Sequence, residues 1–201
     1  MNRFLQLLVL SFILLCSSQS FAALTWTPYG AGPFDLSAVS SGDQAETPVD
    51  IFHNKDTIGI HADLTMTSFT PVQNPTNEWI TGQVEFEILF ANDFAAAFEI
   101  TSNGAAPQGT VSVEYGQDHD EVIEIPLGTF NFDQTYSYGI ALLNDRIAFY
   151  QNFREVNAIS YTTLGYVPFI EEFMIEGWAS NGSLSGSADN VYLATAAPVP
   201  V

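Results

Sequence analysis

Two glutamates, Glu85 and Glu87, stand two residues apart in the otherwise largely apolar run QVEFEILF at 83–90. Successive side chains of an extended chain point to opposite faces, so both carboxylates share one face and the apolar residues between them share the other. Carboxyl groups paired on an open sheet face are the groups that glycoside hydrolysis uses to move protons. Two solvated positions on a wet sheet face would give the same pattern, and both interpretations stay open at this point.

The elements that must position this pair are predicted to be strands. Between 58 and 67 apolar and polar residues alternate, which is typical of a strand with one buried face and one wet face. Clusters of Gly, Asn, Asp and Pro separate further extended runs. These runs are predicted at 79–90, 95–101, 110–115, 122–125, 136–156, 169–178 and 191–194. Many short strands with few helix-period segments predict an all-β jelly-roll sandwich of two antiparallel sheets, and 23–55 is expected to be an entry strand followed by loop.

The stretch YSYGIALLNDRIAFYQNFREV at 136–156 is predicted to be an antiparallel meander. Its apolar residues alternate on both sides of Asn144-Asp145, and a second turn is expected at Asn152-Phe153. A helix would need apolar spacings of three and four, which the run lacks.

This meander resembles the hairpin of laminarinase-like glucanases (glycoside hydrolase family 16) and of their concanavalin A-like lectin relatives. Those proteins carry a run of the type Y-x-I-x-W-x-x-D-x-I-x-F-Y-x-[ND]-G-x-x-V. The matching residues here are Tyr138, Ile140, Asp145, Ile147, Phe149, Tyr150, Asn152 and Val156. Leu142 replaces the Trp, which often contributes to the sugar-facing wall, and Phe153 replaces the turn Gly. The resemblance implies a concanavalin A-like fold.

The same resemblance assigns roles to the glutamates. Family 16 hydrolases carry E-x-D-x-E, or E-x-D-x-x-E where the strand has a bulge, in which the first Glu is the nucleophile and the last is the acid/base. Glu85 and Glu87 fall on the first two positions, and the last falls on Leu89 or, with a bulge, on Phe90. Neither side chain can transfer a proton. Glu85 and Glu87 would be catalytic only in an enzyme whose acid comes from elsewhere, for example Glu99 or Glu114.

Sugar binding needs flat apolar rings together with fixed hydrogen-bonding groups. Trp79 and Trp178 are the candidate stacking residues, and Gln83, with Glu85 and Glu87, supplies hydrogen bonds. Trp26 is a weaker stacking candidate. Core packing is the alternative explanation for each tryptophan.

Asp189 is the candidate metal ligand. It resembles the Asp that opens the final strand of the family 16 sandwich and holds a structural Ca²⁺ in many members, where oxygen ligands complete the shell. No cofactor is required by the pattern, since the sequence has no zinc spacing among its histidines and no phosphate-cradling glycine loop.

Residues 1–22 are predicted to be a secretory signal peptide, with Arg3 before an apolar segment and the small-x-small site Ser20-Phe21-Ala22. The only cysteine, Cys16, lies within it, so the exported chain would contain no disulfide. The protein is therefore expected to be exported from a bacterium to the periplasm, the cell surface or the medium, with no membrane insertion after cleavage.

The chain carries 23 acidic residues against four basic ones. Such a charge repels phosphate backbones and anionic lipids, so nucleic acid is not expected as a partner. We expect one β-sandwich domain at 23–195 and an extended tail at 196–201. The expected function is non-catalytic, lectin-like binding of a neutral or cationic polysaccharide. The alternatives are a glucanase with a displaced acid/base and a structural protein without a glycan ligand.

Overall fold

The computed structural model describes residues 24–42, 44–73, 80–91, 94–115 and 121–197, and almost all of its regular structure is strand. Sheet A contains eight strands: β1 (Leu24–Pro28), β2 (Phe34–Asp35), β3 (Ala38–Ser40), β5 (Thr57–Pro71), β10 (Thr135–Leu142), β11 (Arg146–Gln151), β12 (Arg154–Ser160) and β14 (Gly182–Ala196). Sheet B contains six: β4 (Ala45–Asp50), β6 (Thr81–Phe90), β7 (Phe94–Ser102), β8 (Gln108–Tyr115), β9 (Glu121–Thr129) and β13 (Ile170–Ser180). A single turn of helix, α2 (Tyr161–Leu164), follows β12.

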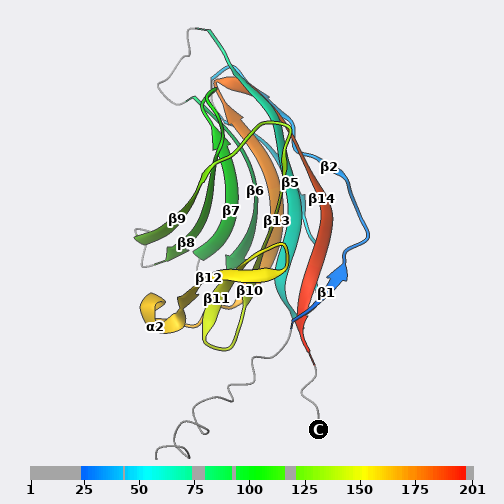
Figure 1. The fold of residues 1–201 in the computed structure, drawn as a ribbon, viewed down its shortest axis with the longest axis vertical. Coiled ribbons are helices and arrows are strands. Elements are labelled where there is room, and N and C mark those ends of the chain that lie inside the picture. The colour runs from blue at the N-terminus through cyan, green and yellow to red at the C-terminus, as the bar shows by residue number, and fades with distance from the viewer. Residues whose placement is uncertain (1–23, 43, 74–79, 92–93, 116–120, 198–201) are drawn as a thin grey trace, which may run out of the picture.

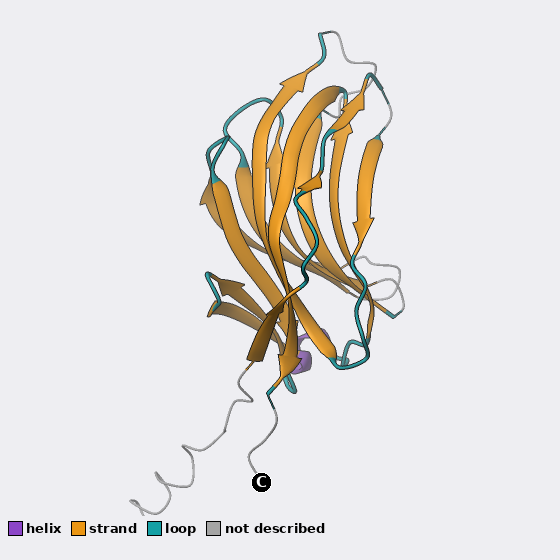
Figure 2. Ribbon diagram, turned by 90° about the vertical axis from the view of Figure 1, so that its right-hand side faces the viewer, coloured by secondary structure: helices purple, strands orange, loops and turns teal. Residues whose placement is uncertain are grey.

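All of the strand pairings are antiparallel. Sheet A has the order β1-β14-β5-β10-β11-β12, with β2 and β3 also paired to β14, and sheet B has the order β4-β13-β6-β7-β8-β9. The strands of both sheets are long and curved and the sheets pack face to face (Figures 1 and 2). The predicted all-β jelly-roll sandwich is confirmed.

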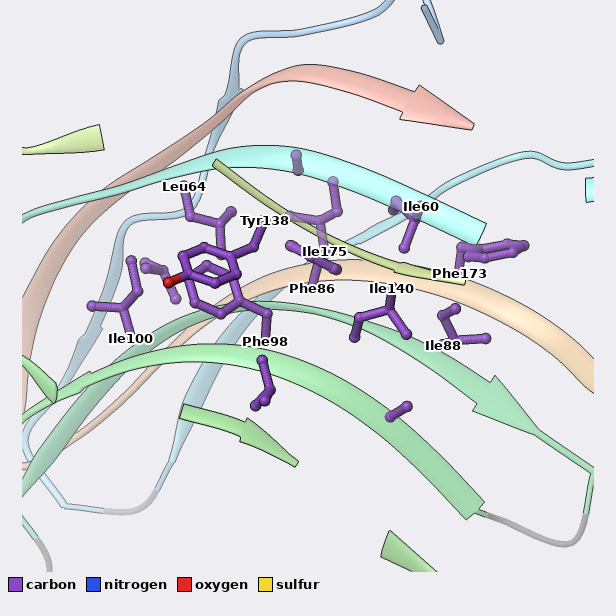
Figure 3. Close-up of a cluster of buried hydrophobic side chains, with 14 of the residues drawn as sticks. Ile60, Leu64, Phe86, Ile88, Phe98, Ile100, Tyr138, Ile140, Phe173 and Ile175 are labelled. Carbon is purple, nitrogen blue, oxygen red and sulfur yellow. The ribbon is translucent and has the colours of Figure 1, made fainter. Parts of the chain in front are cut away.

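The core lies between the two sheets and is filled by the inward residues of each strand. Phe86 and Phe98 come from sheet B, while Ile60, Tyr138 and Ile140 come from sheet A, and Figure 3 shows them interleaved. Phe98 stacks on Tyr138 with ring centroids 4.1 Å apart. The alternation seen in the sequence thus separates the core face from the outer face, as predicted for β5, β6 and the meander.

The meander is confirmed as β10, β11 and β12. Asn152 and Phe153 both have positive φ, 49° and 63°, which is the backbone that the second turn requires. At the first turn the amide of Leu143 donates to the carbonyl of Arg146.

Two segments differ from the sequence prediction. Residues 34–50, expected to be loop, contain β2, β3 and β4, and β14 begins at Gly182 rather than 191. Ser and Gly dilute the apolar alternation in both segments, and Pro48 does so in the first, so only long-range pairing makes these segments strands. Between β2 and β3, Leu36 is fully buried and its carbonyl packs against Gly177 of β13, so this segment helps to close the space between the sheets.

No helix within the described ranges is long and apolar enough to cross a membrane.

Candidate functional site

Glu85 lies at the centre of a row of glutamates on the outer face of sheet B. On β6 it is directly opposite Glu176 of β13 on one side and Glu99 of β7 on the other. Directly opposite residues of antiparallel strands have Cβ atoms about 5 Å apart, and like charges in such positions repel. The fold therefore assembles three carboxyl groups from three strands around one point.

Glu85 is only 7 % exposed although it points away from the core. Gln83 Nε2 donates a 2.7 Å hydrogen bond to Glu85 Oε2. Burial, a hydrogen bond to Glu176 and the charges of Glu99 and Glu87 raise the pKa of Glu85 well above its usual range. The protonated form of Glu85 is therefore favoured, and it can donate a hydrogen bond to the facing Glu176.

The two neighbouring glutamates are shifted in the same direction. Burial, followed by the charges of Glu176 and Glu114, raises the pKa of Glu87 to about 7. Burial also raises the pKa of Glu99, against the effect of Ser112, whose Oγ donates a 2.7 Å hydrogen bond to Glu99 Oε1. Glu87 therefore gains or loses its proton near neutral pH.

The rest of the outer face of sheet B is acidic too. The register gives this face five further carboxylates: Glu46, Asp50, Glu114, Glu124 and Glu172. No lysine or arginine occurs in any of its six strands. We call this surface the acidic face.

Leu89 occupies the third outward position of β6. Pairing of β6 with β7 runs from Gly82 to Phe90 without a register shift, so Glu85, Glu87 and Leu89 follow one another on the acidic face. Phe90 is 1 % exposed and belongs to the core. The strand therefore has the form without a bulge, and no proton donor stands where the resemblance expects the acid/base.

Trp178 lies beside this row. It is directly opposite Gln83 on β6 and Glu46 on β4, and it is partly exposed. Gln83, Glu85, Glu87 and Trp178 are thus brought together on one face. Trp79 lies outside the described residues.

Trp26 does not belong to this site. It lies on the outer face of sheet A, where it makes edge contacts with His61, Tyr150 and Phe153 at centroid distances of 5.5–5.8 Å. Trp26 therefore lies on the other sheet from the glutamates, because β1 pairs with β14 in sheet A.

Asp189 lies opposite Asp63 of β5, next to a shift in register of β14. The Oδ2 atom of Asp63 accepts a 2.8 Å hydrogen bond from Asn190 Nδ2. Among the residues that the structure describes, no group of three or more His, Cys, Asp or Glu side chains could hold a metal ion. Calcium binding at Asp189 stays a prediction. Backbone oxygens would have to complete the coordination shell of the ion.

A cavity of about 740 Å³ lies elsewhere, at one end of the sandwich, and none of the site residues predicted from the sequence lines it. The buried carboxyl groups therefore mark the acidic face, and not this cavity, as the candidate site.

The architecture is that of the concanavalin A-like jelly rolls, and the resemblance seen in the sequence is confirmed at the level of the fold. The structure is similar to that of the Crh5 transglycosylase in complex with NAG, with a TM-score of 0.60, 10% identity, and coverage of 89% of this chain and 86% of that one.

Two further solved structures are similar. One belongs to work on endo-acting O-glycanases that human gut microbiota express to initiate mucin breakdown (TM-score 0.57, 9% identity, 90% and 97% coverage). The other is the catalytic domain of an endo-1,3-β-glucanase (laminarinase) from Thermotoga petrophila (TM-score 0.52, 11% identity, 76% and 69% coverage). At these identities the likeness establishes the fold alone. No family model and no curated protein matches the sequence.

Sequence reasoning did not find the role of Glu176 beside Glu85. The alternation in 170–180 does put Glu176 on the same face of its strand as Trp178. The sequence alone does not show that β13 and β6 are neighbours in sheet B, and only this pairing places Glu176 opposite Glu85.

Proposed function

We propose that the protein binds a carbohydrate chain across the acidic face and does not cleave it. The observation that carries this proposal is the outward row on β6. Glu85 and Glu87 offer polar groups suited to sugar hydroxyls, whereas Leu89 stands where the resemblance expects the acid/base glutamate. Trp178, beside Gln83, offers an apolar ring of the kind on which sugars stack. The fold that the chain shares with carbohydrate-active proteins supports the proposal.

The charge of the face narrows the ligand class. Eight carboxyl groups besides Glu85 share one face with no cation on its strands. Charge complementarity favours neutral or amino-bearing glycans and disfavours uronate or sulfated ones. Binding of an amino glycan should weaken as salt is added, because exposed charges are screened.

The test is a glycan array followed by product analysis, with protein obtained by expressing the complete sequence in a secreting host. We expect saturable binding of a neutral or cationic glycan without release of products. Trp178→Ala should weaken binding about tenfold, in line with the loss of an aromatic anchor. The control Phe52→Ala removes an aromatic residue that is 85% exposed and lies outside the acidic face, so it should leave binding unchanged. Binding only to anionic glycans, or no binding at all, would contradict the proposal.

A hydrolase is the second candidate, because the pKa of Glu85 is raised and two other carboxyl groups, those of Glu176 and Glu99, lie opposite it. A retaining mechanism places its two carboxyl groups about 5–5.5 Å apart, on either side of the glycosidic bond. Glu85 and Glu176 are hydrogen-bonded to each other, which leaves no room for that bond. Glu99 is the better partner for Glu85 in this alternative. Turnover that Glu85→Gln and Glu99→Gln each abolish would establish the hydrolase and overturn the non-catalytic proposal.

We also propose that the protein is exported after removal of residues 1–22, and that Asp189 contributes to a calcium site. The N-terminal sequence of the secreted product tests the first. A thermal shift on adding Ca²⁺, absent in Asp189→Asn, tests the second.

A further inference from the structure

The cavity of about 740 Å³ lies at the end of the sandwich where β1 begins and β14 ends, and its lining includes Leu24 and Ala196. The turn between β10 and β11 and the loop before β13 complete it. Figure 1 shows these segments together at the lower end of the molecule. The volume falls within the range of about 300–1,000 Å³ that is usual for sites of small molecules.

The cavity wall is largely apolar. Ile58 and Leu142 come from strands of sheet A, and Ile170 begins β13 in sheet B, so the cavity reaches the edge of the core. Val167 and Phe169, which also line it, are 72% and 75% exposed. Water therefore meets apolar surface here, and a ligand with an apolar body would gain free energy by covering it.

Two positively charged side chains also line the cavity. The described residues contain three lysines or arginines, Lys55, Arg146 and Arg154, and the first two line this cavity. The guanidinium of Arg146 donates to Asp145 and Glu155, which balance its charge. Lys55 is exposed and makes no ion pair with any residue in the described ranges. An anionic head group therefore finds a partner at Lys55, beside an apolar wall.

We propose that this cavity binds an amphipathic carboxylate, a small molecule with an unbranched apolar body and one carboxylate head. The body lies against Leu142 and Ile170, and the head lies at Lys55. The proposal is independent of carbohydrate binding, because the cavity shares no residue with the acidic face.

Decanoate is the probe, with decanol and decyltrimethylammonium as matched probes of the same apolar length. Binding is measured by isothermal titration calorimetry on protein obtained by expressing the complete sequence. We expect decanoate to bind more tightly than decanol, and decyltrimethylammonium to bind most weakly. Lys55→Ala should weaken decanoate about three- to fivefold, the usual effect of losing one exposed ion pair, and leave decanol unchanged. Lys55→Arg should restore the binding of decanoate.

Two controls separate the cavity from general effects. Arg154→Ala removes one positive charge outside the cavity and should change neither affinity. Ala196→Trp places a bulky ring in the cavity from an exposed position, so the fold should persist while saturable binding of decanoate and decanol is lost. Failure of decanoate to bind would overturn the proposal, as would equal affinity for the three probes or binding that Ala196→Trp leaves intact.

Discussion

Glu85 and Glu176 lie directly opposite each other on β6 and β13, and burial together with a hydrogen bond between their side chains raises the pKa of Glu85. Two facing carboxylates on a sheet would repel each other, and burial of Glu85 increases that cost. Sharing a proton removes most of it. With one proton between them, the two side chains can both donate and accept hydrogen bonds.

The facing pair predicts that replacing either carboxyl group by an amide stabilises the protein at alkaline pH. At pH 8 the folded state must either keep Glu85 protonated or ionise it beside Glu176. Glu85→Gln and Glu176→Gln should each raise the free energy of unfolding, and the double variant should gain less than the sum of the two, with a coupling of about 0.5–3 kcal/mol. Urea unfolding of the four proteins measures the cycle. Additive effects would mean that the two carboxyl groups do not interact.

The raised pKa of Glu87 predicts how stability changes with pH. Its pKa is about 7 in the folded protein and near 4.5 in the unfolded chain, so between these values the folded state binds more protons. Its contribution to stability is complete below pH 4.5 and is lost as the pH rises through about 7. The loss should be on the order of 1–3 kcal/mol.

The variant Glu87→Gln should lose this part of the pH dependence, which urea unfolding between pH 4.5 and 8 measures. Glu171→Gln is the matched control, since it removes an exposed carboxylate beside the site. If both variants have the slope of the parent protein, Glu87 titrates normally.

A third prediction concerns His61 on the outer face of sheet A. Its ring is fully buried beneath Phe153, at a centroid distance of 3.9 Å, and neither ring nitrogen has a hydrogen-bond partner in the described part of the chain. Burial lowers the pKa of His61 from 6.5 to about 4, against the attraction of Asp63. The stability that comes from a neutral His61 is present above pH 6.5 and is lost as the pH falls through about 4.

Phe153→Gly should expose His61 and move its pKa towards 6.5, as followed by NMR titration of the imidazole. Glycine also suits the positive φ at this position, so the turn should persist. Asn152→Gly changes the other residue of the same turn and should leave the titration of His61 as it is. An unchanged pKa in Phe153→Gly would show that elements other than Phe153 bury the ring.

A fourth prediction tests the closure of the sandwich by the segment between β2 and β3. A methyl group on Gly177 would collide with the carbonyl oxygen of Leu36. Gly177→Ala should therefore destabilise the protein by about 2–3 kcal/mol, as overpacking of a core does. Gly30→Ala meets no atom within 4 Å and bears only the strain of its φ of 81°, so it should cost about 1 kcal/mol. Thermal unfolding compares the two, and equal losses would mean that Leu36 can move away.

The local pattern predicted a large part of this protein. Alternation separated Val84, Phe86 and Ile88 from Glu85 and Glu87, and the turn at Asn152-Phe153 was correctly expected. The strands β2, β3 and β4 were not, since their short and polar segments form strands only through pairing with β14 and β13.

The sequence by itself determined the fold class, the face on which each side chain of the central strands lies, and the absence of a proton donor at Leu89. Each of these depends on the period of two along one extended chain. Only the tertiary structure decided that Glu176 and Glu99 flank Glu85, that Trp26 lies on the opposite sheet, and that Lys55 lines a cavity. Those relationships join residues far apart in the chain, and the order of strands in a sheet is set by long-range packing that no local pattern contains.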